Sequence, residues 1–245
     1  ANIGTTATGW VLTLAGVEGA IKPTDLVPII VLITAIVIMF AKDVMKKQIA
    51  SILFGFSVLI WGMSFMSGAS DKLMEIPEFT SVLTLFSNPF FGILIGAAIT
   101  AIIQSSSASV GILQVLSATG ILSYRTCIPI IIGVNIGACV PVLLSSIGAN
   151  KNGKRTALIY LIFNVLGSII FMACLYGLDA FVHFAFLQKT ATATSMGIAV
   201  INTVFKVVSA AALMPFTHQL ELLVRWMVKD SSGSKDLKGE RDIAE

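Results

Sequence analysis

The chain has 245 residues, of which 56% are hydrophobic and only 12% are charged, and its formal net charge is +3. Soluble domains carry charge on about a quarter of their residues, so this composition excludes an ordinary soluble globular domain. It predicts one all-α polytopic membrane domain, in which the small positive charge reflects the orientation of loops in the bilayer and not a nucleic acid partner.

Apolar stretches separated by charged residues predict the helices of this domain. A bilayer core of about 30 Å needs about 20 apolar residues per helical crossing. In chain order we expect a half-span over 2–14, helices over 25–41 and 49–66, a re-entrant hairpin within 79–124, a broken span over 128–147, spans over 157–176 and 196–216, and an amphipathic surface helix over 219–228. We expect the polar tail from 230 onward to be disordered.

The longest uncharged run, Phe79–Tyr124, is too long for a single crossing. Asn88-Pro89 and the polar block Gln104–Ser107 interrupt it. A glutamine and several hydroxyls in hydrocarbon are costly unless they are hydrogen-bonded, and adjacent serines compete with the helical backbone for hydrogen bonds. We therefore expect a re-entrant hairpin whose helix breaks at this block and points oxygens into a polar cavity. Broken helices of this kind form solute sites in secondary transporters.

Basic residues predict the orientation of the chain. Loops 42–47 and 151–155, together with the helix that starts near 217, carry more lysine and arginine than the loops of the opposite side. Because cytoplasmic loops are enriched in these residues, we expect this side and the C-terminus to be cytoplasmic. The assignment requires that 79–124 re-enters without a net crossing, since an extra crossing would move 151–155 to the other side.

A short internal echo predicts an inverted repeat. Asn2–Thr6 (Asn-Ile-Gly-Thr-Thr) matches Asn135–Cys139 (Asn-Ile-Gly-Ala-Cys), and in the expected topology the spans that follow them run in opposite directions. Transporters with inverted repeats bind solute where the repeats meet. We expect residues 1–47 to be the C-terminal part of a first repeat whose own serine hairpin would lie upstream of Ala1. Residues 48–216 would form the second repeat and final span, and 217–245 a surface helix and tail.

Two motifs carry a resemblance to a known family. The block Gln104–Ala108, followed by Gly133–Gly137, resembles the type II sodium-dependent phosphate cotransporters, in their bacterial form. The opening Ala1–Thr6 resembles the end of that family's first-repeat motif, and similarity extends over about residues 1–228.

The resemblance implies sodium-coupled symport of inorganic phosphate across the plasma membrane, the inner membrane of a bacterium, by alternating access. Phosphate ligands carried over from the family are Ser105, Ser106, Ser107, Asn135 and Asn2. Sodium ligands carried over are Gln104, Ser105, Thr5 and Thr6. The implied partners are phosphate, sodium as co-substrate and the lipid bilayer, and a homo-oligomer or a soluble regulatory domain downstream is compatible with the sequence.

The chemistry of these residues suits both solutes. Sodium is a hard cation that prefers neutral and carboxylate oxygens, and helix N-termini offer N–H groups and a favourable dipole to phosphate. No arginine lies near the serine block in sequence. We therefore expect the anion to bind weakly unless sodium binds too, and this mutual dependence would couple the two fluxes.

Two short stretches depart from the family pattern, and two residues have two interpretations each. The family usually has threonines where this chain has Ala138-Cys139, which leaves the number of sodium ions open, and usually has Phe-Asn where this chain has Phe205-Lys206. An intramembrane lysine either lines a water-filled cavity or pairs with an acid. Asn135 either binds solute or only hydrogen-bonds across helices and holds the repeats together.

Other functions and roles compete with transport. A non-transporting scaffold or phosphate sensor would explain the incomplete motifs. An intramembrane serine hydrolase would need a base near a serine, whereas the chain has no Gly-x-Ser-x-Gly elbow and both histidines are remote from the block in sequence. We therefore predict that the chain is not an enzyme. Four glycines are predicted to be close-packing positions, namely Gly92, Gly96, Gly111 and Gly120.

Overall fold

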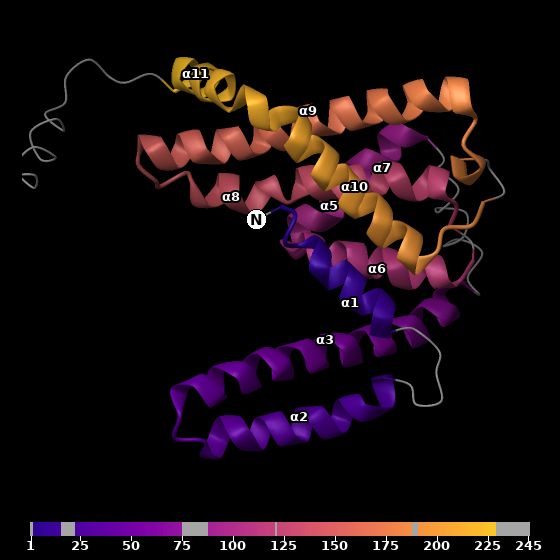
Figure 1. The fold of residues 1–245 in the computed structure, drawn as a ribbon, viewed down its shortest axis with the longest axis vertical. Coiled ribbons are helices and arrows are strands. Elements are labelled where there is room, and N and C mark those ends of the chain that lie inside the picture. Colours follow the sequence, from indigo (N-terminus) through magenta and orange to yellow (C-terminus); the bar gives the residue numbers. More distant parts are fainter. Residues whose placement is uncertain (1, 16–22, 75–87, 121, 188–190, 229–245) are drawn as a thin grey trace, which may run out of the picture.

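A computed structural model of the chain describes residues 2–15, 23–74, 88–120, 122–187 and 191–228. These residues are helical almost throughout (Figure 1). The elements are α1 (Thr6–Ala15), α2 (Pro23–Phe40), α3 (Val44–Met74), α5 (Pro89–Ile103), α6 (Ser106–Ala118), α7 (Tyr124–Gly137), α8 (Cys139–Ser145), α9 (Lys151–Val182), the 3₁₀ turn η1 (Ala185–Leu187), α10 (Ser195–Leu213), the 3₁₀ turn η2 (Met214–Phe216) and α11 (Thr217–Met227).

The lengths of these helices agree with a multi-pass all-α membrane protein. Among the residues that the structure describes, four segments are long and apolar enough to cross a bilayer, namely Val44–Gly62, Tyr124–Ser145, Lys151–Val182 and Ser195–Met227. By contrast α1, α5 and α6 have 10, 15 and 13 residues. A crossing needs about 20, so these three helices have the length of half-spans.

Two predicted helices start too late in the sequence, because the basic residues before them were interpreted as loops. The structure begins α3 at Val44 and α9 at Lys151, inside the predicted loops 42–47 and 151–155. Lysine and arginine are good helix formers, so a charge marks where a helix leaves the hydrocarbon and not where it ends. The predicted break in 128–147 occurs at Ala138, between α7 and α8. The predicted disordered tail lies outside the described residues.

Glycines pack α5 directly against α7. A side chain at Gly96 would meet the carbonyl oxygen of Ile130, and one at Gly133 would meet that of Ile93. Gly92 and Gly96 face α7, and Gly133 and Gly137 face α5, so each helix contributes glycines four residues apart and the two helices run parallel. Small residues at this spacing let membrane helices approach until their backbones touch.

Gly120 has a different role from the predicted one. Its φ is +76°, and no atom lies within 4 Å of the position that a side chain would take. It ends α6 in a left-handed turn, a conformation that glycine adopts at no steric cost.

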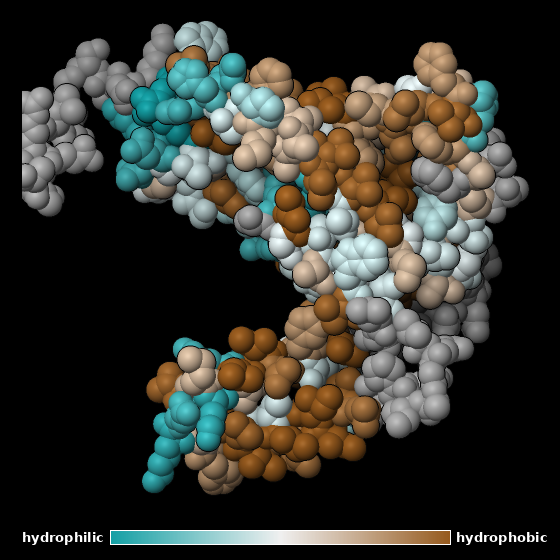
Figure 2. All heavy atoms as spheres, viewed as in Figure 1, coloured by the Kyte–Doolittle hydropathy of each residue, from teal (hydrophilic) through white to brown (hydrophobic). Residues whose placement is uncertain are grey.

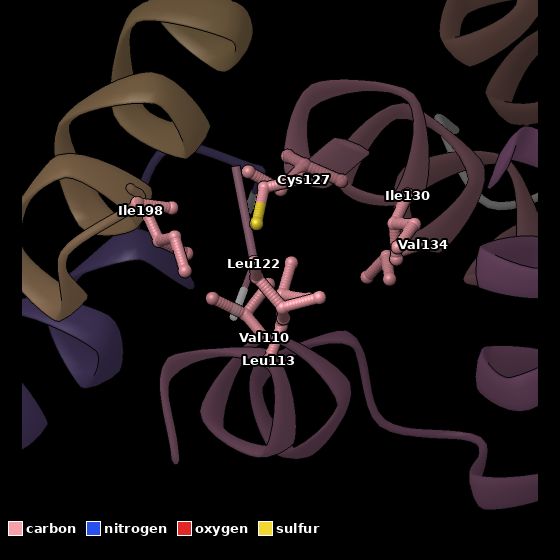
Figure 3. Close-up of a cluster of buried hydrophobic side chains, with 9 residues drawn as sticks. Val110, Leu113, Leu122, Cys127, Ile130, Val134 and Ile198 are labelled. Atoms are coloured by element: carbon pink, nitrogen blue, oxygen red, sulfur yellow. The ribbon is translucent and has the colours of Figure 1, made fainter. Parts of the chain in front are cut away.

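The buried core lies where α6, α7 and α10 meet. Figure 3 shows Val110 and Leu113 of α6, Cys127 of α7 and Ile198 of α10 pointing toward one another. On the other side of α7, Phe205 of α10 packs edge-to-face on Phe171 of α9, with ring centroids 5.2 Å apart. These contacts fix the rotation of α10 about its axis.

The α2–α3 pair projects from the other helices and meets them where α3 contacts α6 (Figure 1). Its large apolar side chains are exposed, as at Leu32, Met39 and Ile52, and Figure 2 shows them as a brown surface. Between this pair and the remaining helices the molecule is hollowed on one side, and the N-terminus lies beside that hollow in the same view (Figures 1 and 2). Exposed apolar helices of this kind are suited to lipid.

Candidate functional site

The helix break predicted at the glutamine–serine block is present at Gln104-Ser105. Gln104 ends α5 in the left-handed region, with φ 60° and ψ 18°, and its N–H donates to the carbonyl of Thr100 at 2.7 Å. Ser105 is extended and caps α6, since its hydroxyl accepts from the N–H of Ala108 at 3.2 Å. A residue other than glycine with positive φ is uncommon and clusters at functional sites.

The two half-helices form a hairpin with this break at its tip. Ile95 and Ile99 of α5 line one small cavity together with Ser109, Ile112 and Leu116 of α6, so α6 folds back along α5. Short, apolar helices joined at a polar tip have the form of a re-entrant hairpin.

The start of the chain meets the first turn of α6. The hydroxyl of Ser107 donates to the carbonyl of Thr5 at 3.4 Å, and the hydroxyl of Thr5 donates to the carbonyl of Asn2 at 2.8 Å. Asn2 in turn accepts through Oδ1 from the hydroxyl of Tyr160 at 3.1 Å, and Thr6 donates to the carbonyl of Ile3 at 2.7 Å. The first Asn-Ile-Gly motif and the serine block are therefore neighbours, although a hundred residues separate them in sequence.

Lys206 joins this group from α10. Its side chain is only 4% exposed, and its ammonium donates a hydrogen bond to the hydroxyl of Thr5. Among the residues that the structure describes, Lys206 has no carboxylate partner. Thr5 thus accepts two hydrogen bonds, one from Ser107 at its carbonyl and one from Lys206 at its hydroxyl.

Asn135 is connected to the site through α10, the helix that carries Lys206. It is 3% exposed, and its amide donates to the carbonyl of Ile131 at 2.7 Å and to Oδ1 of Asn202 at 3.3 Å. Asn202 lies one helical turn before Lys206 on α10. An asparagine amide has two N–H groups, and both are engaged here.

The structure therefore brings together Asn2, Thr5 and Ser107, with Lys206. Within the described residues, no hydrogen bond joins Gln104, Ser106 or Asn135 directly to this group. Gln104 is exposed at the hairpin tip, and Ser105 and Ser106 are half-buried. The neighbour Ser107 is also half-buried, so the block is open on one side.

Gln114 was missed by the sequence analysis. Its side chain is 2% exposed, and its Nε2 lies 3.1 Å from the carbonyl of Gly9, from the hydroxyl of Thr13 and from the carbonyl of Ser195. It thereby links α6 to both α1 and α10. The signal was a lone amide in the apolar run 110–116, which interrupts an otherwise hydrophobic half-span.

The larger cavity does not fit a hydrophilic solute. It has a volume of about 480 Å³ and lies between α7, α9 and α10, where side chains such as Ile128, Phe171 and Val204 line it. An apolar lining cannot replace the hydration of an anion. The polar junction of α1, α6 and α10 is the better candidate.

The donors at this junction favour an anion, and its neutral oxygens could hold a hard cation. The first N–H groups of α6 are free of helical partners and carry the positive end of its dipole, next to the buried ammonium of Lys206. Thr5 and Thr6 each use their hydroxyl hydrogen on a backbone carbonyl, which leaves oxygen lone pairs. No cluster of histidine, cysteine or carboxylate suited to a metal occurs in the described part of the chain.

Comparison with known proteins identifies the family. A model described as Na+/Pi-cotransporter matches residues 1–68 and 58–203, which is most of the chain. The chain belongs to the Na+/Pi-cotransporter family. This confirms the resemblance carried by the glutamine–serine block, and because the family is one of transporters it supports the prediction that the chain is not an enzyme.

Three similar proteins illustrate which functions members of this family are named for. The chain is 26% identical to the uncharacterized protein YqeW of Bacillus subtilis, over 83% of this chain and 65% of that protein. It is 23% identical to a Salmonella typhimurium protein named "Putative inorganic phosphate export protein YjbB", over 83% of this chain and 37% of that protein. It is 33% identical to human sodium-dependent phosphate transport protein 2B, over 39% of this chain and 15% of that protein.

The chain thus spans less than two thirds of the length of these relatives. No solved structure matches it.

Proposed function

We propose that this chain forms part of a transporter that moves inorganic phosphate across the plasma membrane together with sodium. The observation that carries the proposal is the meeting of Ser107 and Lys206 on Thr5, at the tip of a hairpin of two half-helices. Solute sites of secondary transporters lie at broken helices, and the family supplies phosphate as the solute.

Phosphate would bind at the N-terminus of α6. The hydroxyls of Ser105 and Ser106 and the N–H groups of Ser106 and Ser107 would be donors, and the hydroxyl of Ser107 would join them once it leaves the carbonyl of Thr5. The dipole of α6 favours negative charge. Asn2 accepts through Oδ1 from the hydroxyl of Tyr160, and its amide N–H groups would be further donors to phosphate. Direct contact of Asn135 with phosphate stays a prediction, because both of its N–H groups are engaged and one would have to be released.

Sodium would bind to neutral oxygens of the same junction. Gln104 and Ser105 offer side-chain and carbonyl oxygens where the helix is unwound, and Thr5 and Thr6 offer hydroxyl lone pairs at the start of α1. Hard cations prefer such ligands. A sodium ion between these groups would lie close to the phosphate, so each solute would raise the affinity for the other.

The orientation proposed from charge is supported by one contact. Arg155, near the start of α9, donates through Nη2 to the carbonyl of Val228 at 2.8 Å. The basic end of α9 and the end of α11 therefore lie on the same side of the molecule, and we place both in the cytoplasm. The inverted repeat, the division at residues 47 and 216 and the alternating-access mechanism are part of the same proposal.

The direction of transport follows from the coupling. An inward sodium gradient would drive phosphate uptake, whereas the name of the YjbB relatives carries the word export. Phosphate flux measured with the sodium gradient imposed in either direction distinguishes uptake from export.

The test is radiolabelled phosphate flux in proteoliposomes that contain the full-length protein. We expect an inward sodium gradient to raise uptake at least about tenfold over a potassium gradient. Ser107→Ala should lower sodium-driven uptake by a similar factor, because it removes a hydroxyl at the N-terminus of α6. Ser145→Ala is the matched control, since Ser145 is exposed and its hydroxyl bonds only to the carbonyl of Val142 in its own helix.

Two results would overturn the proposal in different ways. Uptake that is indifferent to sodium would reject the coupling and leave phosphate transport in place. Phosphate binding without any flux would instead favour a phosphate sensor that keeps a transporter fold.

A further inference from the structure

Lys206 is a buried cation without a visible counter-charge. It lies in the membrane-spanning segment Ser195–Met227 and is 4% exposed. A charge removed from water is unfavourable unless an opposite charge or several hydrogen bonds compensate it. Its one hydrogen bond, to the hydroxyl of Thr5, does not supply that compensation.

None of the carboxylates whose side chains the structure describes is available to Lys206. Glu221 pairs with Arg225 on α11 at 2.8 Å. Asp179 accepts from the N–H of Phe184 at the end of α9, and Asp43 accepts from the N–H of Met45 at the start of α3. The groups around Lys206 on α10 are neutral, namely Asn202 one turn before it, Phe205 beside it and the buried Ser209 after it.

A second positive feature points to the same place. Ser107 lies in the first turn of α6, and its hydroxyl contacts the same residue, Thr5, that holds the ammonium. The positive end of the α6 dipole and a full positive charge therefore meet at Thr5. Two like electrostatic features close together in a low dielectric repel each other, and an anion between them would relieve both.

We propose that Lys206 is the fixed counter-charge of the transported anion. Its ammonium, on a flexible four-carbon stem, would turn from the Thr5 hydroxyl to an oxygen of a tetrahedral oxyanion held at Ser107. This inference rests on the proposed phosphate site. It differs from the expectation that only sodium can supply positive charge there, because that expectation considered neighbours in sequence and Lys206 lies far downstream.

A fixed cation changes how phosphate and sodium are linked. If the chain itself supplies a positive charge, phosphate binds without sodium, and sodium raises its affinity only modestly. Without the lysine, the same site would depend on sodium for all of its positive charge. By linkage, phosphate would then raise the affinity for sodium by the same larger factor.

The experiment is equilibrium binding of radiolabelled inorganic phosphate to the purified full-length protein, in sodium chloride and in choline chloride. We expect the unmodified protein to bind phosphate in choline. Lys206→Gln should weaken binding in choline at least about tenfold and increase the effect of sodium, because it removes the charge while keeping much of the side chain. Lys206→Arg should stay within about threefold of the unmodified protein, because it keeps the charge.

Thr203→Val is the matched control. Thr203 lies one turn before Lys206 and also joins α10 to α1, through the indole N–H of Trp10 at 2.9 Å, but it is neutral. We expect its phosphate binding to be unchanged. Size-exclusion profiles of all variants show whether each is folded.

Three results would overturn the inference. One is equal phosphate affinity of Lys206→Gln and the unmodified protein in choline. Another is an equal loss in Lys206→Arg and Lys206→Gln, which would make the role one of packing. The third, which needs no variant, is unmodified protein that binds phosphate in sodium and not in choline. Absence of phosphate binding in every condition would instead reject the proposed function, and this inference with it.

Discussion

The hairpin is held on its two sides by interfaces of opposite chemistry. On one side α5 packs on α7 through glycines, backbone against backbone, with no room for a side chain. On the other side α6 contacts α1 and α10 through Gln114, and Ser107 and Lys206 both bond to Thr5, directly before α1. The glycine interface is a close contact of two backbones, whereas hydrogen bonds at the polar interface can be exchanged for bonds to a solute. We infer that α5–α7 is the rigid part and α1–α6–α10 the working part.

The largest expected effect comes from the glycine interface. Gly133→Ala places a methyl group against the carbonyl of Ile93, so α5 and α7 must separate. We expect a loss of about 3 kcal/mol of stability, as for overpacked cores. Fluorescence-detected size exclusion after heating should show a much lower apparent melting temperature.

Gly177→Ala in α9 is the control for that variant. No atom lies within 4 Å of the position that its side chain would take. Alanine is the better helix former, so this variant should be as stable as the unmodified protein or slightly more stable. Equal melting temperatures of the Gly133 and Gly177 variants would mean that α5 and α7 are not in backbone contact.

A smaller effect is expected from Gln114, on the polar interface. Gln114→Leu removes the hydrogen bonds to Gly9, Thr13 and Ser195 while keeping most of the volume. The amide shares two N–H groups among these three acceptors, and hydrogen bonds between membrane helices contribute about 0.6 kcal/mol each on average, so we expect a loss of about 1 kcal/mol. The melting temperature should fall less than for Gly133→Ala.

The exposed Gln219 of α11 offers the matched control, as Gln219→Leu. Its melting temperature should not change. If Gln114→Leu were as stable as this control, the bonds from Gln114 to α1 and α10 would not form in the membrane, and the polar interface would lose its main support.

The comparison also shows what could be predicted from the sequence. The break at Gln104-Ser105 was predictable because its causes are local: a polar block in an apolar run and serines that cap a helix. The approach of Asn2–Thr6 to the serine block was implied by the family resemblance. The contact of Lys206 with Thr5 was not, because it depends on how α10 packs against α1, and only the packing of side chains such as Phe205 on Phe171 fixes that rotation.

The smallest expected effect decides the role of Asn135. Both of its N–H groups are engaged, one of them by Asn202, so in this arrangement it has no donor left for phosphate. We expect Asn135→Ala and Asn202→Ala to weaken phosphate binding by equal and small factors, about twofold, because each removes the same link that positions Lys206 on α10. The double variant should bind phosphate no more weakly than either single variant. In folding stability, the two substitutions should show a coupling energy of about 0.6 kcal/mol. A much larger loss of phosphate affinity for Asn135→Ala than for Asn202→Ala would show instead that Asn135 releases a bond and contacts the anion, and would extend the working interface to α7.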